Sequence, residues 1–238
     1  MLLAAGRGTR LGDLTRSVPK PLLEVGGRPI VVRILDGLIA AGICEVTIVT
    51  GYLAGVLEAE LGNGAGSGLD IRYVRQAALD GTARALSLAR EHLGDGPFLF
   101  AWGDIVVRGE NYGHVLRASR FADAVIAVNE VDDPWAGAAV YVEQDAGGAL
   151  LVRRIVEKPA PGTSGTRWNN AGFGVLGPAI WPMVDALEPS PRGEYELPRA
   201  IQKLVESGAR VVAVPVEGPW FDIGAPESLD AARRAFAR

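Results

Sequence analysis

The chain has 238 residues, of which 48% are apolar and 22% are charged. This balance is typical of a globular protein with one large domain or two small ones. The formal net charge is −4 and no long basic run occurs, which argues against a nucleic-acid partner. No apolar run reaches the roughly 18 residues that a membrane-spanning helix needs, so we expect no membrane partner.

Cys44 is the only cysteine, so the chain cannot form an intrachain disulfide. This cysteine content is typical of a reducing compartment, and we expect a cytoplasmic protein. Because its neighbours in the sequence are apolar, Cys44 is predicted to be a buried small hydrophobic residue.

The first half of the chain alternates between helical and strand patterns. A proline near the start, a glycine after the end and an apolar face between them predict a helix over 28–41. A β-branched run predicts a strand at 45–50. Similar patterns predict helices at 53–61 and 82–93, and strands at 70–74 and 97–101.

The second half begins with strands that have only turns between them. These are predicted at 122–129, 138–142, 151–156 and 171–176. Helices at 178–187 and 195–207, a strand at 211–216 and a helix at 226–237 follow. The order predicts an α/β fold in a single domain over 1–238. We expect a mixed, mostly parallel sheet covered on both faces, with an antiparallel insertion.

A glycine-rich segment opens the chain, and Pro19-Lys20-Pro21 follows it. Glycines allow backbone N–H groups to close around phosphate oxygens, and Arg10 and Lys20 can add charge. The segment lacks the third glycine of a dinucleotide fingerprint and the Lys-Ser/Thr ending of a P-loop. Taken alone, it is equally compatible with an ordinary turn. Its residues are Leu3, Ala4, Ala5, Gly6, Arg7, Gly8, Thr9, Arg10 and Leu11.

Three further positions are candidates for chemistry. Gln76 precedes Gly81 and Thr82, and its amide offers both a donor and an acceptor to the edge of a base. Asp104 follows a buried strand, at the place where open α/β sheets bind ligands. Asp222 lies near the C-terminus, and two carboxylates together suit Mg²⁺. Each position alone is also explained by a polar turn or a helix cap.

The segments Ala-Ala-Gly-Arg-Gly-Thr-Arg-Leu and Pro-Lys-Pro together resemble the signature of the sugar nucleotidyltransferase family. The family includes thymidylyl-, uridylyl- and guanylyltransferases that act on sugar 1-phosphates. The resemblance continues in order through the segments around Gln76, Asp104 and Asp222. It implies a three-layer α/β/α, Rossmann-like arrangement whose antiparallel insertion binds the sugar phosphate. It also implies nucleotide binding by Leu3, Ala4, Ala5, Gly6, Gly8, Thr9, Arg10, Gln76, Gly81, Thr82 and Asp104.

On the sugar side, the resemblance extends to Trp135-Ala136-Gly137, Glu157-Lys158-Pro159 and Asn170-Ala171-Gly172. It implies sugar-phosphate binding by Gly137, Glu157, Lys158, Asn170 and Asp222. Magnesium is implied at Asp104 and Asp222, with Arg10, Lys20 and Lys158 as further catalytic residues. Arg192 to Leu197 also resembles a family segment, and we interpret it mainly as structural because Glu194 and Glu196 lie at a predicted helix start. A role for Glu194 near the sugar is the alternative.

The resemblance implies a Mg²⁺-dependent transfer from UTP or dTTP to a hexose 1-phosphate, with release of pyrophosphate. Transfer from GTP to mannose 1-phosphate, or from CTP to a phosphorylated alcohol, is the alternative within the enzyme class. A catalytically silent nucleotide-sugar-binding regulator is the alternative outside it. The last motif lies near the end of the chain, so we expect no C-terminal β-helix domain, and a homo-oligomer remains open.

Overall fold

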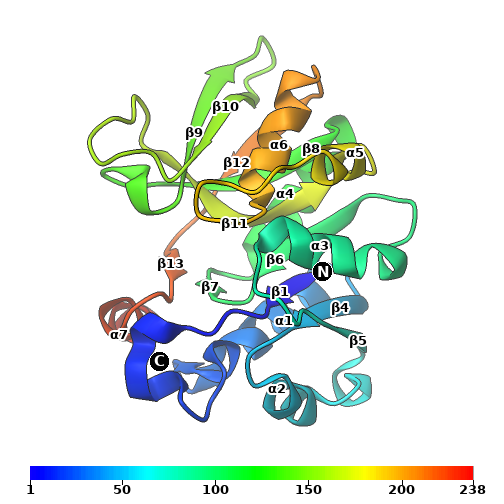
Figure 1. Ribbon diagram of the computed structural model, residues 1–238, viewed down its shortest axis with the longest axis vertical. Helices are drawn as coiled ribbons and strands as arrows, with labels where there is room; N and C mark the ends of the chain where they lie inside the picture. Colours follow the sequence, from blue (N-terminus) through cyan, green and yellow to red (C-terminus); the bar gives the residue numbers. More distant parts are fainter. Residues whose placement is uncertain (238) are drawn as a thin grey trace.

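The computed structural model describes residues 1–237 (Figure 1). The helices are α1 (Ile30–Ala40), α2 (Ala54–Leu61), α3 (Thr82–Ala89), α4 (Glu110–Ala118), α5 (Ile180–Asp185), α6 (Leu197–Glu206) and α7 (Pro226–Ala235). The first strands are β1 (Leu2–Ala4), β2 (Glu24–Val25), β3 (Arg28–Pro29), β4 (Glu45–Thr50), β5 (Asp70–Arg75), β6 (Phe98–Trp102) and β7 (Ile105–Val106). The later strands are β8 (Ala124–Glu130), β9 (Ala138–Gln144), β10 (Leu150–Glu157), β11 (Trp168–Leu176), β12 (Val211–Pro215) and β13 (Phe221–Asp222).

A nine-stranded sheet forms the centre of the structure, in the order β5-β4-β1-β6-β11-β8-β12-β10-β9. β11 and β10 are antiparallel to their neighbours, and the other neighbouring pairs are parallel. The predicted mixed α/β sheet is therefore present. The predicted antiparallel strands belong to this same sheet, because β11 pairs with β6 on one side and β8 on the other.

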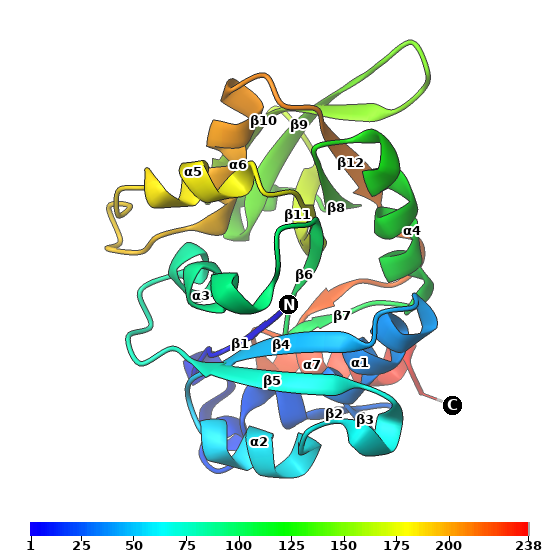
Figure 2. The same cartoon turned by 90° about the vertical axis from the view of Figure 1, so that its right-hand side faces the viewer.

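The sheet has a buried apolar cluster on each face. Alternation along the strands explains this, since Ile48 of β4 and Val125 of β8 join one cluster, and the next residues, Val49 and Ile126, join the other. The first cluster packs against α1, α2, α4 and α7, and the second against α3, α5 and α6. Figure 2 shows α3, α5 and α6 to the left of the sheet and α4 to the right. None of the helices within residues 1–237 is long and apolar enough to span a bilayer.

Most predicted elements are present, with shifted boundaries. The helix predicted to start at Arg28 starts at Ile30, because Pro29 is extended and Arg28–Pro29 pairs with β2 as a short strand. Helix α4 was not predicted, because Gly113 and its polar neighbours give a weak helical pattern. Its Tyr112 is fully buried and meets Phe173 edge-on at 5.2 Å, so tertiary packing stabilises this helix.

The prediction for Cys44 is wrong. The residue is exposed. It lies in the connection between α1 and β4, directly before the sheet begins at Glu45. Apolar neighbours in the sequence do not bury a residue in a surface connection.

Gly174 of β11 lies where two strands approach closely. A Cβ at this position would run into the carbonyl oxygen of Val125 and lie 3.0 Å from the Phe100 ring. We expect Gly174→Ala to lower the free energy of unfolding by about 1–3 kcal/mol, as overpacking does elsewhere. Gly55→Ala is the control, since it lies in exposed α2 with nothing near its Cβ. The free energy of unfolding of this control should rise by up to about 1 kcal/mol, because alanine favours a helix more than glycine does. Urea unfolding measures both, and equal stability of the two variants would contradict the packing.

Candidate active site

A cleft of about 360 Å³ gathers segments that lie far apart in the sequence. Its walls come from the chain that follows β1, β5, β6 and β10, together with β13 and the segment before α6. Sixteen of its lining residues were predicted or lie within predicted segments. They are Leu3, Ala5, Gly6, Arg10, Gln76, Gly81, Thr82, Asp104, Ala136, Gly137, Glu157, Lys158, Arg192, Glu194, Glu196 and Asp222.

The structure does not place every predicted residue in this cleft. Ala4 is buried in the core of the sheet, and Thr9 is exposed at the start of a 3₁₀ helix over Thr9–Thr15. Gly8 has a φ of +65° and turns the chain into that helix, where its carbonyl accepts a bond from Thr15 Oγ1 at 3.0 Å. A Cβ on Gly8 would lie 3.2 Å from the Thr15 methyl group, so this glycine shapes the loop.

Lys20 and the two aspartates form the charged centre of the site. Lys20 Nζ donates to Asp104 Oδ2 at 2.6 Å and lies 3.8 Å from Asp222 Oδ1. Asp104 follows β6, and the β7–β13 ribbon brings Asp222 beside it (Figure 1). A backbone bond from Ile223 N to Asp104 O at 3.0 Å fixes this approach. Lys20 does not line the cleft, but it supports the two residues that do.

The electrostatics of this centre suit a divalent cation. The pKa of Asp222 is raised, first because the carboxyl is desolvated in the cleft and second because Asp104 is negatively charged. Lys20, Arg10 and Lys158 oppose this rise. Within residues 1–237, no group of three acidic, histidine or cysteine side chains could hold a metal. Two carboxylates fit Mg²⁺, which commonly takes one or two and completes its shell with substrate phosphates and water.

The opposite wall is built on the end of β10. Lys158 has a φ of +44°, which is unusual for a lysine, and its N–H donates to Gly137 O at 2.8 Å. Glu157 is largely buried, and burial together with the charge of Glu196 raises its pKa to about 7. Asn170 is also buried, and its Nδ2 has no partner within the described residues. Asn170 does not line the cleft.

Arg192 lies within a cage of carboxylates that the sequence did not reveal. Its guanidinium bonds Glu196, and lies 3.5 Å from Glu157 and from Glu194. All four side chains line the cleft. The prediction that this segment is mainly structural therefore missed a charged surface of the site. Three charged residues within five positions, Arg192, Glu194 and Glu196, were the available signal.

Gln76 lines the wall of the cleft that follows β5. Gln76 Nε2 lies 3.2 Å from both Asp80 Oδ1 and Gly81 O. Thr82 Oγ1 accepts a bond from Leu197 N at 2.9 Å, which ties this wall to α6. Leu79, Ala85 and Trp102 add apolar surface that was not predicted.

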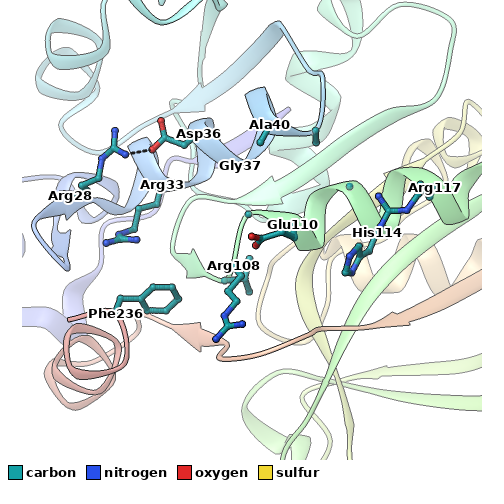
Figure 3. Close-up of a pocket in the computed structure, with 14 residues that line it drawn as sticks. Arg28, Arg33, Asp36, Gly37, Ala40, Arg108, Glu110, His114, Arg117 and Phe236 are labelled. Carbon is teal, nitrogen blue, oxygen red and sulfur yellow. Dashed lines mark ion pairs between the residues drawn. The ribbon is translucent and has the colours of Figure 1, made fainter. Parts of the chain in front are cut away.

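A second cavity of about 820 Å³ lies between α1 and α4 (Figure 3). Arg28, Asp36, Arg108, Glu110 and His114 are among its lining residues, and Arg28 is paired with Asp36 at 2.7 Å. None of the predicted site residues lines it, so the smaller cleft is the candidate active site.

Comparisons with known proteins show the family of this chain. A family model described as nucleotidyl transferase matches residues 1–238. A glucose-1-phosphate thymidylyltransferase of Streptomyces antibioticus is 36% identical, over 94% of this chain and 62% of that protein. A UTP–glucose-1-phosphate uridylyltransferase of Haloferax volcanii is 35% identical, over 98% of this chain and 94% of that protein. The chain thus spans less than two thirds of the first relative and nearly all of the second.

A solved structure shares the fold. It is a UDP-glucose pyrophosphorylase in complex with UDP-glucose, and it superposes with a TM-score of 0.87. The alignment covers 99% of this chain and 96% of that chain, at 21% sequence identity. This likeness supports the mixed α/β fold.

The raised pKa of Glu157 gives a prediction about stability. The folded protein keeps this proton to about pH 7, whereas the unfolded chain releases it near pH 4.5. The folded state therefore binds more protons between these values, and this carboxyl lowers the free energy of unfolding as pH rises through the window. Between pH 5 and pH 8, the free energy of unfolding should therefore fall by about 1–3 kcal/mol less in Glu157→Gln than in wild type.

Urea unfolding at pH 5 and pH 8 measures this difference. Glu143→Gln is the control, since Glu143 is an exposed carboxylate paired with Arg153 at 2.7 Å. The same pH dependence in wild type and Glu157→Gln would show that Glu157 titrates normally.

Proposed function

Because the chain belongs to the nucleotidyl transferase family, we propose that it is a sugar-1-phosphate nucleotidyltransferase. It transfers a nucleoside monophosphate from a nucleoside triphosphate to a sugar 1-phosphate and releases pyrophosphate. The observation that carries the proposal is the convergence of three segments in one cleft. These are the glycine-rich loop with Arg10, the carboxylate pair Asp104 and Asp222 with Lys20 behind it, and the Glu157-Lys158 corner.

The reaction needs no nucleophile from the protein. A phosphate oxygen of the sugar 1-phosphate attacks the α-phosphorus of the triphosphate, and the bond from that phosphorus to the bridging oxygen of pyrophosphate breaks on the opposite side. The contribution of the protein is positioning and charge neutralisation. Backbone N–H groups of the loop around Gly6 face the triphosphate, and Arg10 offsets charge on the departing pyrophosphate.

Lys20 has two tasks in this scheme. Its ion pair with Asp104 holds that carboxylate in place, and its positive charge, behind the two aspartates, helps to offset the charge of the phosphates. Asp104 and Asp222 would hold Mg²⁺, which when bound supplies charge neutralisation at the phosphates. The raised pKa of Asp222 is consistent with a site that gains from a bound cation.

Lys158 is suited to the phosphate of the sugar. Its positive φ is a strained backbone conformation that persists only where the surrounding structure holds it. Such conformations cluster at functional sites. The bond to Gly137 O supplies that support. Glu157 beside it is suited to bond sugar hydroxyls. Asn170 is the further sugar-side candidate, and its Nδ2 has no partner within residues 1–237. The β8–β11 region is thus proposed as the sugar-phosphate side.

The donor is proposed to be UTP or dTTP and the acceptor a hexose 1-phosphate, in line with the names of the similar proteins. The GTP and CTP alternatives are tested by varying both substrates. A silent regulator is disfavoured because Arg10, Lys20, Asp104, Lys158 and Asp222 are all present.

The metal assignment is tested with Asp104→Asn. We expect kcat to fall by about 100-fold or more in Mg²⁺, because a neutral amide cannot replace an anionic ligand. Pyrophosphate release from UTP or dTTP with glucose 1-phosphate measures this. Asp95→Asn is the matched control, since Asp95 is exposed and lies outside the cleft. Near-normal turnover by Asp104→Asn would rule out its metal role.

The sugar-phosphate assignment is tested with Lys158→Ala. Loss of a charged contact should raise KM for the sugar 1-phosphate by about tenfold or more, with a much smaller change for the nucleotide. Lys203→Ala is the control, since Lys203 lies on α6 and does not line the cleft. An equal rise for both substrates would argue that Lys158 acts on the whole site.

A further inference from the structure

We propose that Asp80 is a positioning residue that fixes the Gln76 amide, so that the site selects bases with a ring N–H on the edge facing Gln76. Uracil, thymine and guanine have such an N–H, whereas cytosine and adenine have a bare ring nitrogen there. The inference rests on the proposed function, because it concerns the base of the donor nucleotide. Asp80 itself does not line the cleft.

The orientation of the amide is set by its partners. Gln76 Nε2 lies 3.2 Å from the carboxylate oxygen Oδ1 of Asp80 and 3.2 Å from the carbonyl oxygen of Gly81. Both partners are hydrogen-bond acceptors, so the end of the amide that faces them must be the NH₂ group. The reversed amide would place Oε1 against two acceptor oxygens and leave both contacts repulsive.

The two acceptors are held by the backbone around them. Tyr195 N donates to Asp80 O at 2.8 Å, and Ala83 N donates to Tyr195 O at 2.8 Å. Gly81 lies between these bonds with a φ of +121°, and a Cβ there would run into the Tyr195 backbone. Gln76 is itself buried, and its N–H donates to Thr50 O at 2.8 Å. The amide therefore cannot reverse by a small shift of the loop.

Only the oxygen of the amide remains for a ligand. Both hydrogens of Nε2 are directed to Asp80 and Gly81, and no donor among residues 1–237 bonds Oε1. Gln76 lines the cleft beside Leu79, Gly81 and Ala85, whose apolar surfaces suit the faces of a flat ring. A base that binds against this wall therefore faces a hydrogen-bond acceptor, Gln76 Oε1.

UTP and CTP are the matched pair of probes. The two bases have the same ring size and the same O2, but N3 carries a hydrogen in uracil and a lone pair in cytosine. Uracil N3–H can donate to Oε1, whereas cytosine N3 would face it with both acceptors unpaired. We expect kcat/KM for UTP to exceed that for CTP by about tenfold or more. We also expect the enzyme to turn over dTTP and GTP, and to use ATP as poorly as CTP.

Asp80→Ala tests the positioning role. Without the carboxylate, the amide has one acceptor partner left and can present its NH₂ group to the base. The UTP/CTP ratio of kcat/KM should fall by about tenfold, because kcat/KM rises for CTP and falls for UTP. The ratio does not depend on the fraction of folded enzyme, since both substrates meet the same molecules. A structural effect alone would lower both values together.

Arg84→Ala is the matched control. Arg84 lies 4.0 Å from the Asp80 carboxylate and stacks on the Tyr195 ring at 4.1 Å, and both contacts are exposed. This variant removes the ion pair of Asp80 but leaves the bond to Gln76. We expect its UTP/CTP ratio to stay within about threefold of wild type. A loss as large as that of Asp80→Ala would assign the effect to the ion pair and overturn the inference.

The remaining outcomes separate the inference from the proposed function. The inference is overturned if the active wild type has equal kcat/KM for CTP and UTP, or if Asp80→Ala leaves the UTP/CTP ratio unchanged. Neither result contradicts the transferase activity. A wild type that turns over no nucleotide overturns the proposed function. Dissociation constants for UDP and CDP then decide the inference. Tighter binding of UDP, lost in Asp80→Ala, supports it, and equal binding of the two overturns it.

Discussion

The ion pair between Lys20 and Asp104 holds the charged centre of this protein together. It joins residues 84 positions apart, and the same ammonium group lies 3.8 Å from Asp222. Burial first, and then repulsion by the Asp104 carboxylate, raises the pKa of Asp222. Lys20 is buried, so its charge offsets that repulsion with little screening by water. Under the proposed function, such a site would accept a cation and polyphosphate without a strongly basic protein, which is compatible with a net charge of −4.

The sheet explains how the rest of the cleft reaches this centre. β1 is only three residues long, but it pairs with β4 and β6 on its two sides, so the glycine-rich loop leaves a fixed strand. β11 then reverses direction beside β6 and connects the parallel half of the sheet to β8–β10. The Asp80–Ala83 segment bonds the Tyr195 backbone and so ties the wall with Gln76 to the segment before α6. The walls to which we assign the base and the sugar are therefore connected to one another.

The sequence predicted the regular elements and the ordered motifs well, because periodicity and glycine-rich loops are local properties. It assigned Lys20, Asp104 and Asp222 to one site only through family resemblance, and it did not predict the ion pair between Lys20 and Asp104, since nothing local to position 20 points to position 104. Helix α4 escaped prediction because its stability comes from Tyr112 and Val115 packing on distant strands. Its approach to α1 depends on Gly37, where a Cβ would lie 2.7 Å from the Tyr112 ring. The Arg192 cage was missed for the same reason, since Glu157 joins it from 35 positions away.

Gln76 shows most clearly where sequence reasoning ends. A glutamine amide has a donor end and an acceptor end, so its presence alone allows either kind of base edge. The choice depends on which protein groups occupy one end, and here a carboxylate and a carbonyl occupy the donor end. Those groups are four and five positions along the chain, but the Tyr195 backbone, more than a hundred positions away, fixes where they lie. The base selection that we propose therefore depends on this long-range contact, and a glutamine in an isolated loop would lack it.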